Sequence, residues 1–307
     1  MPFELACPEC QAPLGALESD RQRCARCGVD YHREGGIWGF LRPGRRAAAE
    51  EFIDRYSLVR QREGRDAPTA EDLLALPYRD RTGRHVREWS VRAASFEALL
   101  EEVVIPREER RAARSRILDA GAGVGWLAYR LAHRGHELAA LDLVRGDVAL
   151  GAHAKYPTGF LSIQAELLAL PFASRSVDLV IFNASLHYAS SFAATLREAL
   201  RVLVDGGRIV VMDTPFYRDS SSGRAMLAER EKAFRGRYGL RETREHSEGF
   251  LTGETLERLE KDLGISWAIH QPWYGLRWWA KPWVARLKRS REPAQFMLIV
   301  GKRRGES

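Results

Sequence analysis

The sequence predicts an α/β protein with a Rossmann-like parallel sheet, helices on both faces of that sheet, and a small cysteine-bearing module in front of it. Three observations lead to this fold class. Short apolar runs alternate with stretches of helical periodicity from about residue 112 to residue 303. One of these runs ends in a turn with glycine at every second position. Two pairs of cysteines stand apart from the rest, near the N-terminus.

Length and composition set the broad class. A chain of 307 residues can form one large domain and one small one, and a hydrophobic content of 45% is ordinary for a globular protein. Apolar stretches stay short of the roughly 18 residues of a membrane span. The N-terminus lacks the basic and apolar regions of a signal peptide, so we expect a cytoplasmic protein. The net charge of +7 is mostly due to arginine in a chain rich in Ala, Leu and Gly, and alone it is weak evidence for nucleic-acid binding.

The glycine-rich turn is the most informative segment. Residues 117–125 are Ile-Leu-Asp-Ala-Gly-Ala-Gly-Val-Gly. The apolar run ends at Asp119, and Gly121, Gly123 and Gly125 follow at alternate positions. Glycine lets the backbone approach a ligand closely and adopt dihedral angles that a Cβ atom disfavours. The segment therefore predicts a ligand-binding turn between a strand and a helix.

The next apolar run ends in Asp142. At the tip of the second strand of a βαβ unit, an acidic side chain is placed to accept hydrogen bonds from a ribose. A dinucleotide site requires G-x-G-x-x-G/A, with a small third residue that packs helix on strand. Here that position is Trp126, which is too large for this role. The pattern therefore favours a different nucleoside-containing ligand.

The D-x-G-x-G-x-G run resembles motif I of the class I S-adenosylmethionine (SAM)-dependent methyltransferases. Later segments resemble the family in the same order: an acidic residue before Leu-Pro-Phe at 170–172, a strand at 176–183, and a Gly-Gly turn in which Asp205 replaces the family's proline. The resemblance covers about residues 112–303 and implies a class I methyltransferase sheet. In the family, the residue at the position of Glu166 accepts from the adenine amino group. The cofactor-binding residues that the resemblance and the strand ends indicate are Asp119, Gly121, Gly123, Gly125, Asp142, Glu166 and Asn183.

His187 is the candidate catalytic residue. It follows the fourth strand, and in an open α/β sheet the carboxyl ends of the strands line the ligand crevice. It could act as a general base on an acceptor hydroxyl, or it could simply form part of the pocket wall. Residues 220–222 are three serines followed by Gly223, which predicts a loop rather than a nucleophile. Methyl transfer from a sulfonium requires alignment and exclusion of water, not a protein nucleophile.

All four cysteines occur in two C-x-x-C pairs, Cys7 with Cys10 and Cys24 with Cys27. Four thiolates in two such knuckles suit a closed, structural zinc site. Two disulfides would require an oxidising compartment, and a redox C-x-x-C would lie in a βαβ unit. The segment also resembles the small zinc ribbons that precede methyltransferase domains in some bacterial enzymes, including a 23S rRNA guanine methyltransferase family. We therefore expect structural Zn²⁺ at these cysteines.

These patterns divide the chain into three parts. Residues 1–42 are expected to form the zinc ribbon, and residues 43–110 a helical linker that caps the cofactor pocket. Helical periodicity over 47–62 and 89–104 supports the second part. Residues 111–305 are expected to form the methyltransferase domain, with its last strand at 294–300.

An aromatic and basic insertion at 272–291 separates the sixth and seventh strands of that domain. Because Pro282 disfavours an unbroken helix, we expect a short helix, a kink and a second turn. Three roles remain open for this segment: a lid over the acceptor, a contact with an anionic membrane or a lipid-linked substrate, and stacking on RNA.

The sequence thus predicts a cytoplasmic SAM-dependent methyltransferase with a small or lipid-linked acceptor, methylated on oxygen, nitrogen or carbon. The first alternative is an rRNA methyltransferase that docks RNA through its ribbon and basic surface. The second is a non-catalytic binding protein with the same fold. Retention of the acidic and glycine residues of the predicted cofactor site argues against the second alternative.

Overall fold

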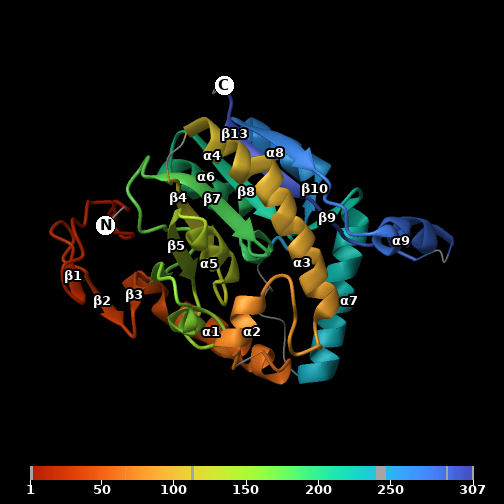
Figure 1. Ribbon diagram of the computed structural model, residues 1–307, viewed down its shortest axis with the longest axis horizontal. Coiled ribbons are helices and arrows are strands. Elements are labelled where there is room, and N and C mark those ends of the chain that lie inside the picture. The colour runs from red at the N-terminus through yellow and green to blue at the C-terminus, as the bar shows by residue number, and fades with distance from the viewer. Residues whose placement is uncertain (1–2, 66, 112–113, 240–246, 288–289, 306–307) are drawn as a thin grey trace.

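The computed structural model describes residues 3–65, 67–111, 114–239, 247–287 and 290–305. Two sheets organise it, one of ten strands and one of three (Figure 1). In chain order the strands are β1 (Arg21–Arg23), β2 (Asp30–Glu34), β3 (Ile37–Gly39), β4 (Arg116–Ala120), β5 (Glu137–Asp142), β6 (Leu161–Gln164), β7 (Val177–Asn183), β8 (Leu203–Met212), β9 (Pro215–Tyr217), β10 (Leu251–Thr252), β11 (Ile265–His270), β12 (Gln295–Phe296) and β13 (Leu298–Arg303).

The large sheet has the strand order β1-β2-β3-β6-β5-β4-β7-β8-β13-β11. The strands from β6 to β8 are parallel, while β13 and β11 close the far edge as an antiparallel pair. From β4, in the middle of the parallel part, the chain moves outward through β5 to β6, and it then returns to continue through β7 and β8 on the other side of β4. This is the doubly wound, Rossmann-like arrangement, and it confirms the predicted fold class.

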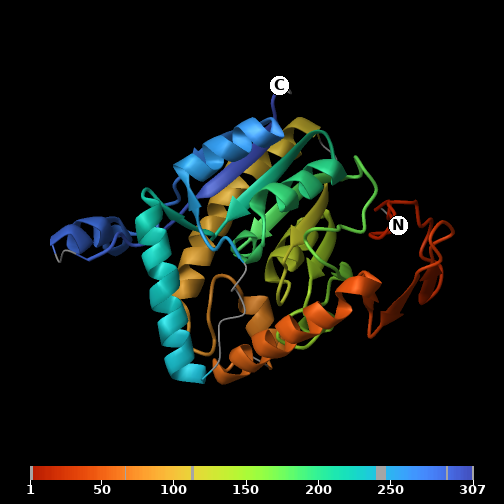
Figure 2. The same cartoon turned by 180° about the vertical axis from the view of Figure 1, so that it is seen from behind.

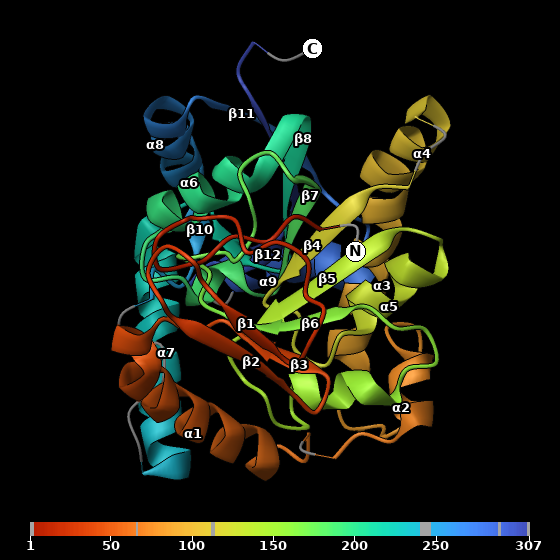
Figure 3. The same cartoon turned by 90° about the vertical axis from the view of Figure 1, so that its left-hand side faces the viewer.

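Helices cover both faces of this sheet, so the domain has three layers (Figure 3). Two buried apolar clusters fill the spaces between the layers. On one face lie α6 (Phe192–Val202) and α8 (Gly253–Leu263). On the other lie α3 (Val86–Leu99), the π-helical turn η2 (Leu100–Val104), α4 (Ile105–Arg111) and α5 (Trp126–His133).

Further helices surround the carboxyl end of the parallel strands (Figures 1 and 2). They are α1 (Arg46–Arg62), which follows a 3₁₀ turn η1 (Pro43–Arg45), α2 (Ala70–Ala75) and α7 (Ser220–Tyr238), together with the short turns η3 (Leu150–Lys155) and η4 (Leu186–Tyr188). Thr69 and Asp72 form a capping box at the start of α2.

The N-terminal module is joined to the large sheet. Its strand β3 pairs in parallel with β6, and Trp38 stands opposite Ile163 in that ladder. Aromatic side chains continue the core across this junction, because the Trp38 and Phe40 rings stack with centroids 5.8 Å apart. The edge of the parallel sheet is therefore covered by the strands of the N-terminal module, as edge strands usually need to be.

The insertion between β11 and β13 contains α9 (Leu276–Leu287), which projects from the body of the molecule (Figures 1 and 2). A short helix, a kink and a second turn were expected here, whereas the structure has one continuous helix with Pro282 inside it. A proline removes one backbone hydrogen bond and can bend a helix without ending it. Within the described residues, no helix is long and apolar enough to cross a bilayer.

Two further expectations differ from the structure. The serines at 220–222 begin α7, where the Asp219 side chain accepts from the Ser221 backbone N–H at 2.8 Å and caps the helix. The last strand begins at Leu298, later than expected, because Gln295 and Phe296 pair with β9 in the small sheet.

Candidate active site

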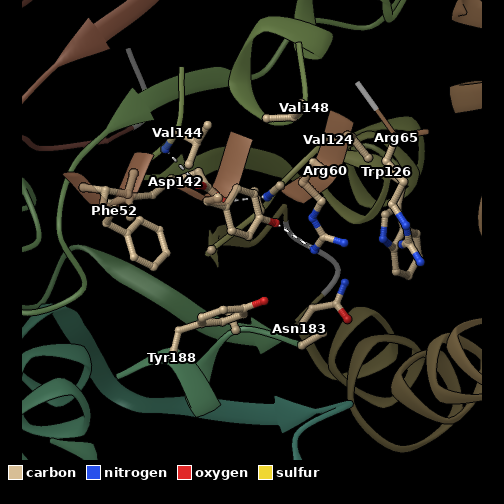
Figure 4. A pocket seen from close by; sticks show the side chains of 18 of the residues that line it. Phe52, Arg60, Arg65, Val124, Trp126, Asp142, Val144, Val148, Asn183 and Tyr188 are labelled. Carbon is tan, nitrogen blue, oxygen red and sulfur yellow. Dashed lines mark hydrogen bonds between the residues drawn. The ribbon is translucent and has the colours of Figure 1, made fainter. Parts of the chain in front are cut away.

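A cavity of about 430 Å³ lies at the carboxyl ends of β4, β5 and β7. Figure 4 shows Asp142 and Val144 on one side of it, Asn183 and Tyr188 on the other, and Arg60 reaching in between. Of the residues predicted to bind a cofactor, five line this cavity: Gly121, Gly123, Asp142, Glu166 and Asn183.

The glycine turn forms the floor of the cavity. Gly121 and Gly123 have positive φ angles of 83° and 53°, which most side chains disfavour. A Cβ atom on Gly121 would lie 2.3 Å from the Ser185 Cβ, whereas nothing lies within 4 Å of the corresponding position on Gly123. The backbone at Gly123 is therefore open to a ligand. Gly125 does not line the cavity, and a Cβ there would instead meet the His153 ring at 2.7 Å.

Asp142 fixes the shape of this turn. Its carboxylate accepts from the Gly123 backbone N–H at 2.8 Å and from the Val144 backbone N–H at 3.0 Å. Burial raises the pKa of Asp142, while these backbone donors lower it. A carboxylate has about four lone-pair sites, so this group retains capacity to accept from ligand hydroxyls.

His153 supports the same turn from below and was missed by the sequence analysis. Its Nε2 lies 2.8 Å from the Gly123 carbonyl oxygen, and its Nδ1 lies 2.9 Å from the Ser162 hydroxyl. Burial lowers the pKa of His153 to about 4, so the ring is neutral at pH 7. The neutral ring therefore donates through Nε2 to the carbonyl and accepts from the serine.

Asp119 does not line the cavity. Its side chain is completely buried, and neither carboxyl oxygen has a hydrogen-bond partner. Burial, together with the nearby charge of Asp142, raises the pKa of Asp119 to about 8. Asp119 therefore acts from beneath the turn, as a group that is largely protonated at neutral pH.

Some buried polar atoms of the described cavity wall have no hydrogen-bond partner. The acceptors among them include Oδ1 of Asn183 and Oγ1 of Thr195. Leaving a buried acceptor unpaired costs free energy, so these atoms indicate a place where a ligand with hydrogen-bond donors would bind.

Glu166 is engaged by two arginines from the segment that follows β3. Arg42 lies 3.1 Å and Arg45 2.8 Å from its carboxylate oxygens. The Glu166 side chain is only 11% exposed, so this ion pair closes one side of the cavity. A ligand amino group can share the carboxylate with these arginines or displace one of them.

A second cavity of about 650 Å³ adjoins the first, at the ends of β7 and β8. His187 lines this second cavity and not the first. Asp213 also lines it, accepts from the Ser95 hydroxyl at 2.6 Å, and has its pKa raised by burial. The residues that line both cavities, and so form a shared wall, are Tyr56, Arg60, Arg65, Arg92, Ala184 and Tyr188.

The sequence analysis gave little indication of this shared wall. Tyr56 lies in the helical stretch 47–62 that was expected to help cap the cofactor pocket, with core packing as the alternative, whereas Arg60 was visible only as part of the helical pattern. In the structure Arg60 donates to the Tyr56 hydroxyl at 2.8 Å, and the Tyr56 and Tyr188 rings lie 6.3 Å apart. The signal that could have found them is their spacing of four residues on one helix, which places both side chains on one face.

The four cysteines meet at a separate place. Their sulfur atoms all lie within 4.8 Å of one another, with Cys7–Cys27 and Cys10–Cys24 distances of 3.5 Å. All four are free. Thiolates at the usual zinc distance in a tetrahedron lie ~3.8 Å apart. The Tyr31 hydroxyl is 3.0 Å from the Cys7 sulfur, so the cluster also has the outer hydrogen bond that structural metal sites favour.

Comparison with known proteins gives a partial match. Residues 118–211 match the family described as "Methyltransferase domain". This part of the chain, which contains the glycine turn and the strands around it, is therefore similar to a methyltransferase domain.

Individual relatives match this chain over only part of its length. The malonyl-[acyl-carrier protein] O-methyltransferase of Methylococcus capsulatus is 31% identical over 50% of this chain and 52% of its own. The demethylmenaquinone methyltransferase of Beutenbergia cavernae is 36% identical over 32% of this chain and 40% of its own. The chain thus spans about half, or less, of the length of these relatives. A solved SAM-dependent methyltransferase from Mesorhizobium loti aligns with a TM-score of 0.48 at 20% identity, over 68% of this chain and 98% of that one.

Proposed function

We propose that the protein transfers a methyl group from SAM to a small or lipid-linked acceptor. The observation that carries this proposal is the pairing of cavities. One cavity has the features of a nucleoside site: the glycine turn, Asp142 and the unpaired Oδ1 of Asn183. It shares a wall with a second cavity that is large enough for the molecule to be methylated. When bound, SAM supplies an electrophilic methyl group on its sulfonium.

The residues of the first cavity suit SAM in chemistry and in burial. Asp142 would accept from the ribose hydroxyls, and the open backbone at Gly123 would let the ligand approach closely. Asn183 offers its unpaired Oδ1 to an amino group. Glu166 would accept from the adenine amino group in competition with its arginines.

The acceptor would occupy the second cavity. There the chain's main task is to hold the nucleophile in line and exclude water, since proximity and alignment contribute much of the rate of such a transfer. His187 lies on this wall and is proposed as the general base for an acceptor that must lose a proton. A cavity of about 650 Å³ has the size of a small-molecule site, which favours a small acceptor over a large RNA surface.

We also propose that Cys7, Cys10, Cys24 and Cys27 hold one structural zinc ion. Four thiolates leave no open position on a tetrahedral ion, so the ion would stabilise the module of residues 1–42 and take no part in the reaction. Because β3 pairs with β6 and the following arginines bind Glu166, this module also buttresses the cofactor cavity.

A peripheral contact with an anionic membrane through α9 is proposed as well. Its apolar residues at 276, 279, 283 and 287 fall within an arc of about 80° at 3.6 residues per turn. The Trp279, Trp283 and Leu287 side chains are exposed at 60%, 57% and 85%. Trp278, on the opposite side of the helix, packs on Phe296 with ring centroids 5.5 Å apart, so the apolar stripe faces away from the body.

The charge of this segment fits the same partner. Residues 271–289 contain several lysines and arginines and no acidic residue. A basic helix with one aromatic stripe is typical of interfacial binding to anionic lipid. α9 projects from the body of the molecule (Figures 1 and 2), and of its residues Trp278 alone lines the second cavity, which disfavours the alternative of a lid that closes over the acceptor.

Calorimetry with S-adenosylhomocysteine tests the proposed function at its first step. We expect this product to bind, NAD to bind far more weakly, and Asn183→Ala to reduce the affinity. Exposed Asp54→Ala on α1 is the control and should bind normally. Tight NAD binding, or no binding of S-adenosylhomocysteine to the folded protein, would exclude a SAM-dependent enzyme.

A further inference from the structure

The second cavity is strongly basic, and nothing in the assignment of a methyltransferase domain requires this. Its lining includes six arginines and three acidic residues. The arginines come from α1, the segment after it, α3 and α7, so four separate parts of the chain converge on one space. They are Arg60, Arg65, Arg87, Arg92, Arg230 and Arg237, and the acidic residues are Glu63, Glu88 and Asp213.

On the shared wall the positive charge is only partly compensated. Arg60 lies 3.1 Å from Glu63, and Arg92 lies 2.7 Å from Glu88. Arg65 contacts both carboxylates. The guanidinium side chains are 19–22% exposed, so they are partly withdrawn from water and weakly screened. Three guanidiniums and two carboxylates leave an excess of one positive charge beside the cofactor cavity.

The outer part of the cavity adds more positive charge. Arg87 on α3 and Arg237 on α7 both line this space. Even with Asp213 counted as charged, the six arginines of the lining outnumber its three acidic residues. The positive charge continues toward α9. Partial burial lowers the pKa of Lys281, and the nearby charges of Arg277 and Arg87 lower it further.

Aromatic side chains line the rest of the cavity. Tyr56 and Tyr188 stand on the shared wall, while Phe234 and Tyr238 come from α7 and Trp278 from the base of α9. The Phe234 and Tyr238 rings lie 4.8 Å apart. Such faces favour a planar or apolar body, and arginines favour the oxygen atoms of a carboxylate or phosphate.

We infer that the acceptor is an anion, with a carboxylate or phosphate group held by these arginines and an aromatic or apolar body against the tyrosines. The inference rests on the proposed function, because it assigns the second cavity to the acceptor. The same charge would repel an ammonium-bearing acceptor, and repulsion of this kind contributes to specificity as much as attraction does. Arg87 and Arg237 are thus specificity-determining residues that need not touch the reacting atoms.

Matched probes test this on the whole protein saturated with S-adenosylhomocysteine. Phenyl phosphate and phenylacetate carry the two anionic groups, 2-phenylethanol is neutral, and phenethylamine is cationic. Calorimetry should show at least one of the two anions binding at least tenfold more tightly than 2-phenylethanol. Phenethylamine should bind most weakly of the four probes. Raising KCl from 50 to 500 mM should weaken binding of the anions only.

Variants assign the binding to this cavity. Arg87→Gln with Arg237→Gln should reduce anion affinity about tenfold and leave S-adenosylhomocysteine binding unchanged, because both residues lie outside the first cavity. Arg224→Gln, an exposed position on the same α7 that lines neither cavity, should have no effect.

Equal binding of the neutral and anionic probes would overturn the inference, and so would anion binding that the double variant leaves intact. Either result, with S-adenosylhomocysteine still bound, would leave the proposed methyl transfer standing. Failure of S-adenosylhomocysteine itself to bind would instead remove the proposed function.

Discussion

Replacing Asp119 with asparagine should change how the stability of the ligand-free protein depends on pH. Asp119 is completely buried, and its pKa is raised from 3.8 to about 8 by burial and by the charge of Asp142. Asparagine has nearly the same shape and never ionises. The variant therefore removes the titration of this site and keeps its packing.

The sign follows from the direction of the shift. Between pH 3.8 and about 8 the folded protein keeps a proton on Asp119 that the unfolded chain loses. Wild-type stability therefore falls as the pH rises through this window, by ~1.4 kcal/mol per pH unit from this one group. From pH 5 to pH 7 the free energy of unfolding of Asp119→Asn should gain roughly 3 kcal/mol relative to wild type.

Urea unfolding of both proteins at pH 5, 6 and 7 measures this difference directly. Asp54→Asn, at an exposed position on α1, serves as the control and should follow the wild-type curve. Parallel curves for wild type and Asp119→Asn would show that Asp119 is already ionised at pH 5, and would refute the account of a protonated carboxyl beneath the glycine turn.

Three further results are expected. Asp142→Ala should weaken SAM binding by about 1–3 kcal/mol, because it leaves the partly buried Gly123 amide unpaired as well as the ribose. Unchanged affinity in calorimetry would contradict this. Purified protein should contain about one zinc per chain by elemental analysis, and a chelator should lower the thermal stability of the cysteine-bearing module more than that of the large domain; a metal-free protein with unreactive thiols would exclude the site. Trp279→Ala with Trp283→Ala should reduce flotation with anionic vesicles by at least tenfold, since each of these half-exposed tryptophans would contribute roughly 1–2 kcal/mol on burial. Tyr78→Ala removes an exposed ring far from α9 in sequence and should leave flotation unchanged. Normal flotation of the double variant would refute the membrane contact.

Much of the central fold could be predicted because its information is local. Short stretches of sequence contain the glycine turn, the acidic residues that end two of the apolar runs, and the alternation of those runs with helical stretches. The strand order then follows, since parallel strands joined by helices pack in few ways. Pairing of the cysteine module with β6 was not predictable, because short strands such as β3 carry little pattern and their partner is chosen by tertiary packing.

The site was predicted in part for the same reason. The structure places the glycine turn and several strand ends at the cavity, as the sequence suggested. Arg60 reaches the cavity from α1, far in sequence from those strands, and His153 acts through Gly123, 30 residues away. Asp119 stays a prediction as a ligand contact, because in the structure it lies beneath the turn, completely buried and outside the cavity lining. The serine run before Gly223 was misinterpreted because Asp and Ser are common both in loops and at the first turn of a helix.

The most direct test of the central claim is transfer of label from methyl-tritiated SAM to extracts of the source cells, separated into small metabolites, lipids and RNA. We predict that the wild-type protein labels a metabolite or lipid fraction, and that Asp142→Ala loses most of this transfer while Asp54→Ala retains it. Label confined to RNA would contradict the proposed acceptor. No transfer to any fraction by a protein that binds S-adenosylhomocysteine would indicate a binding protein rather than a methyltransferase.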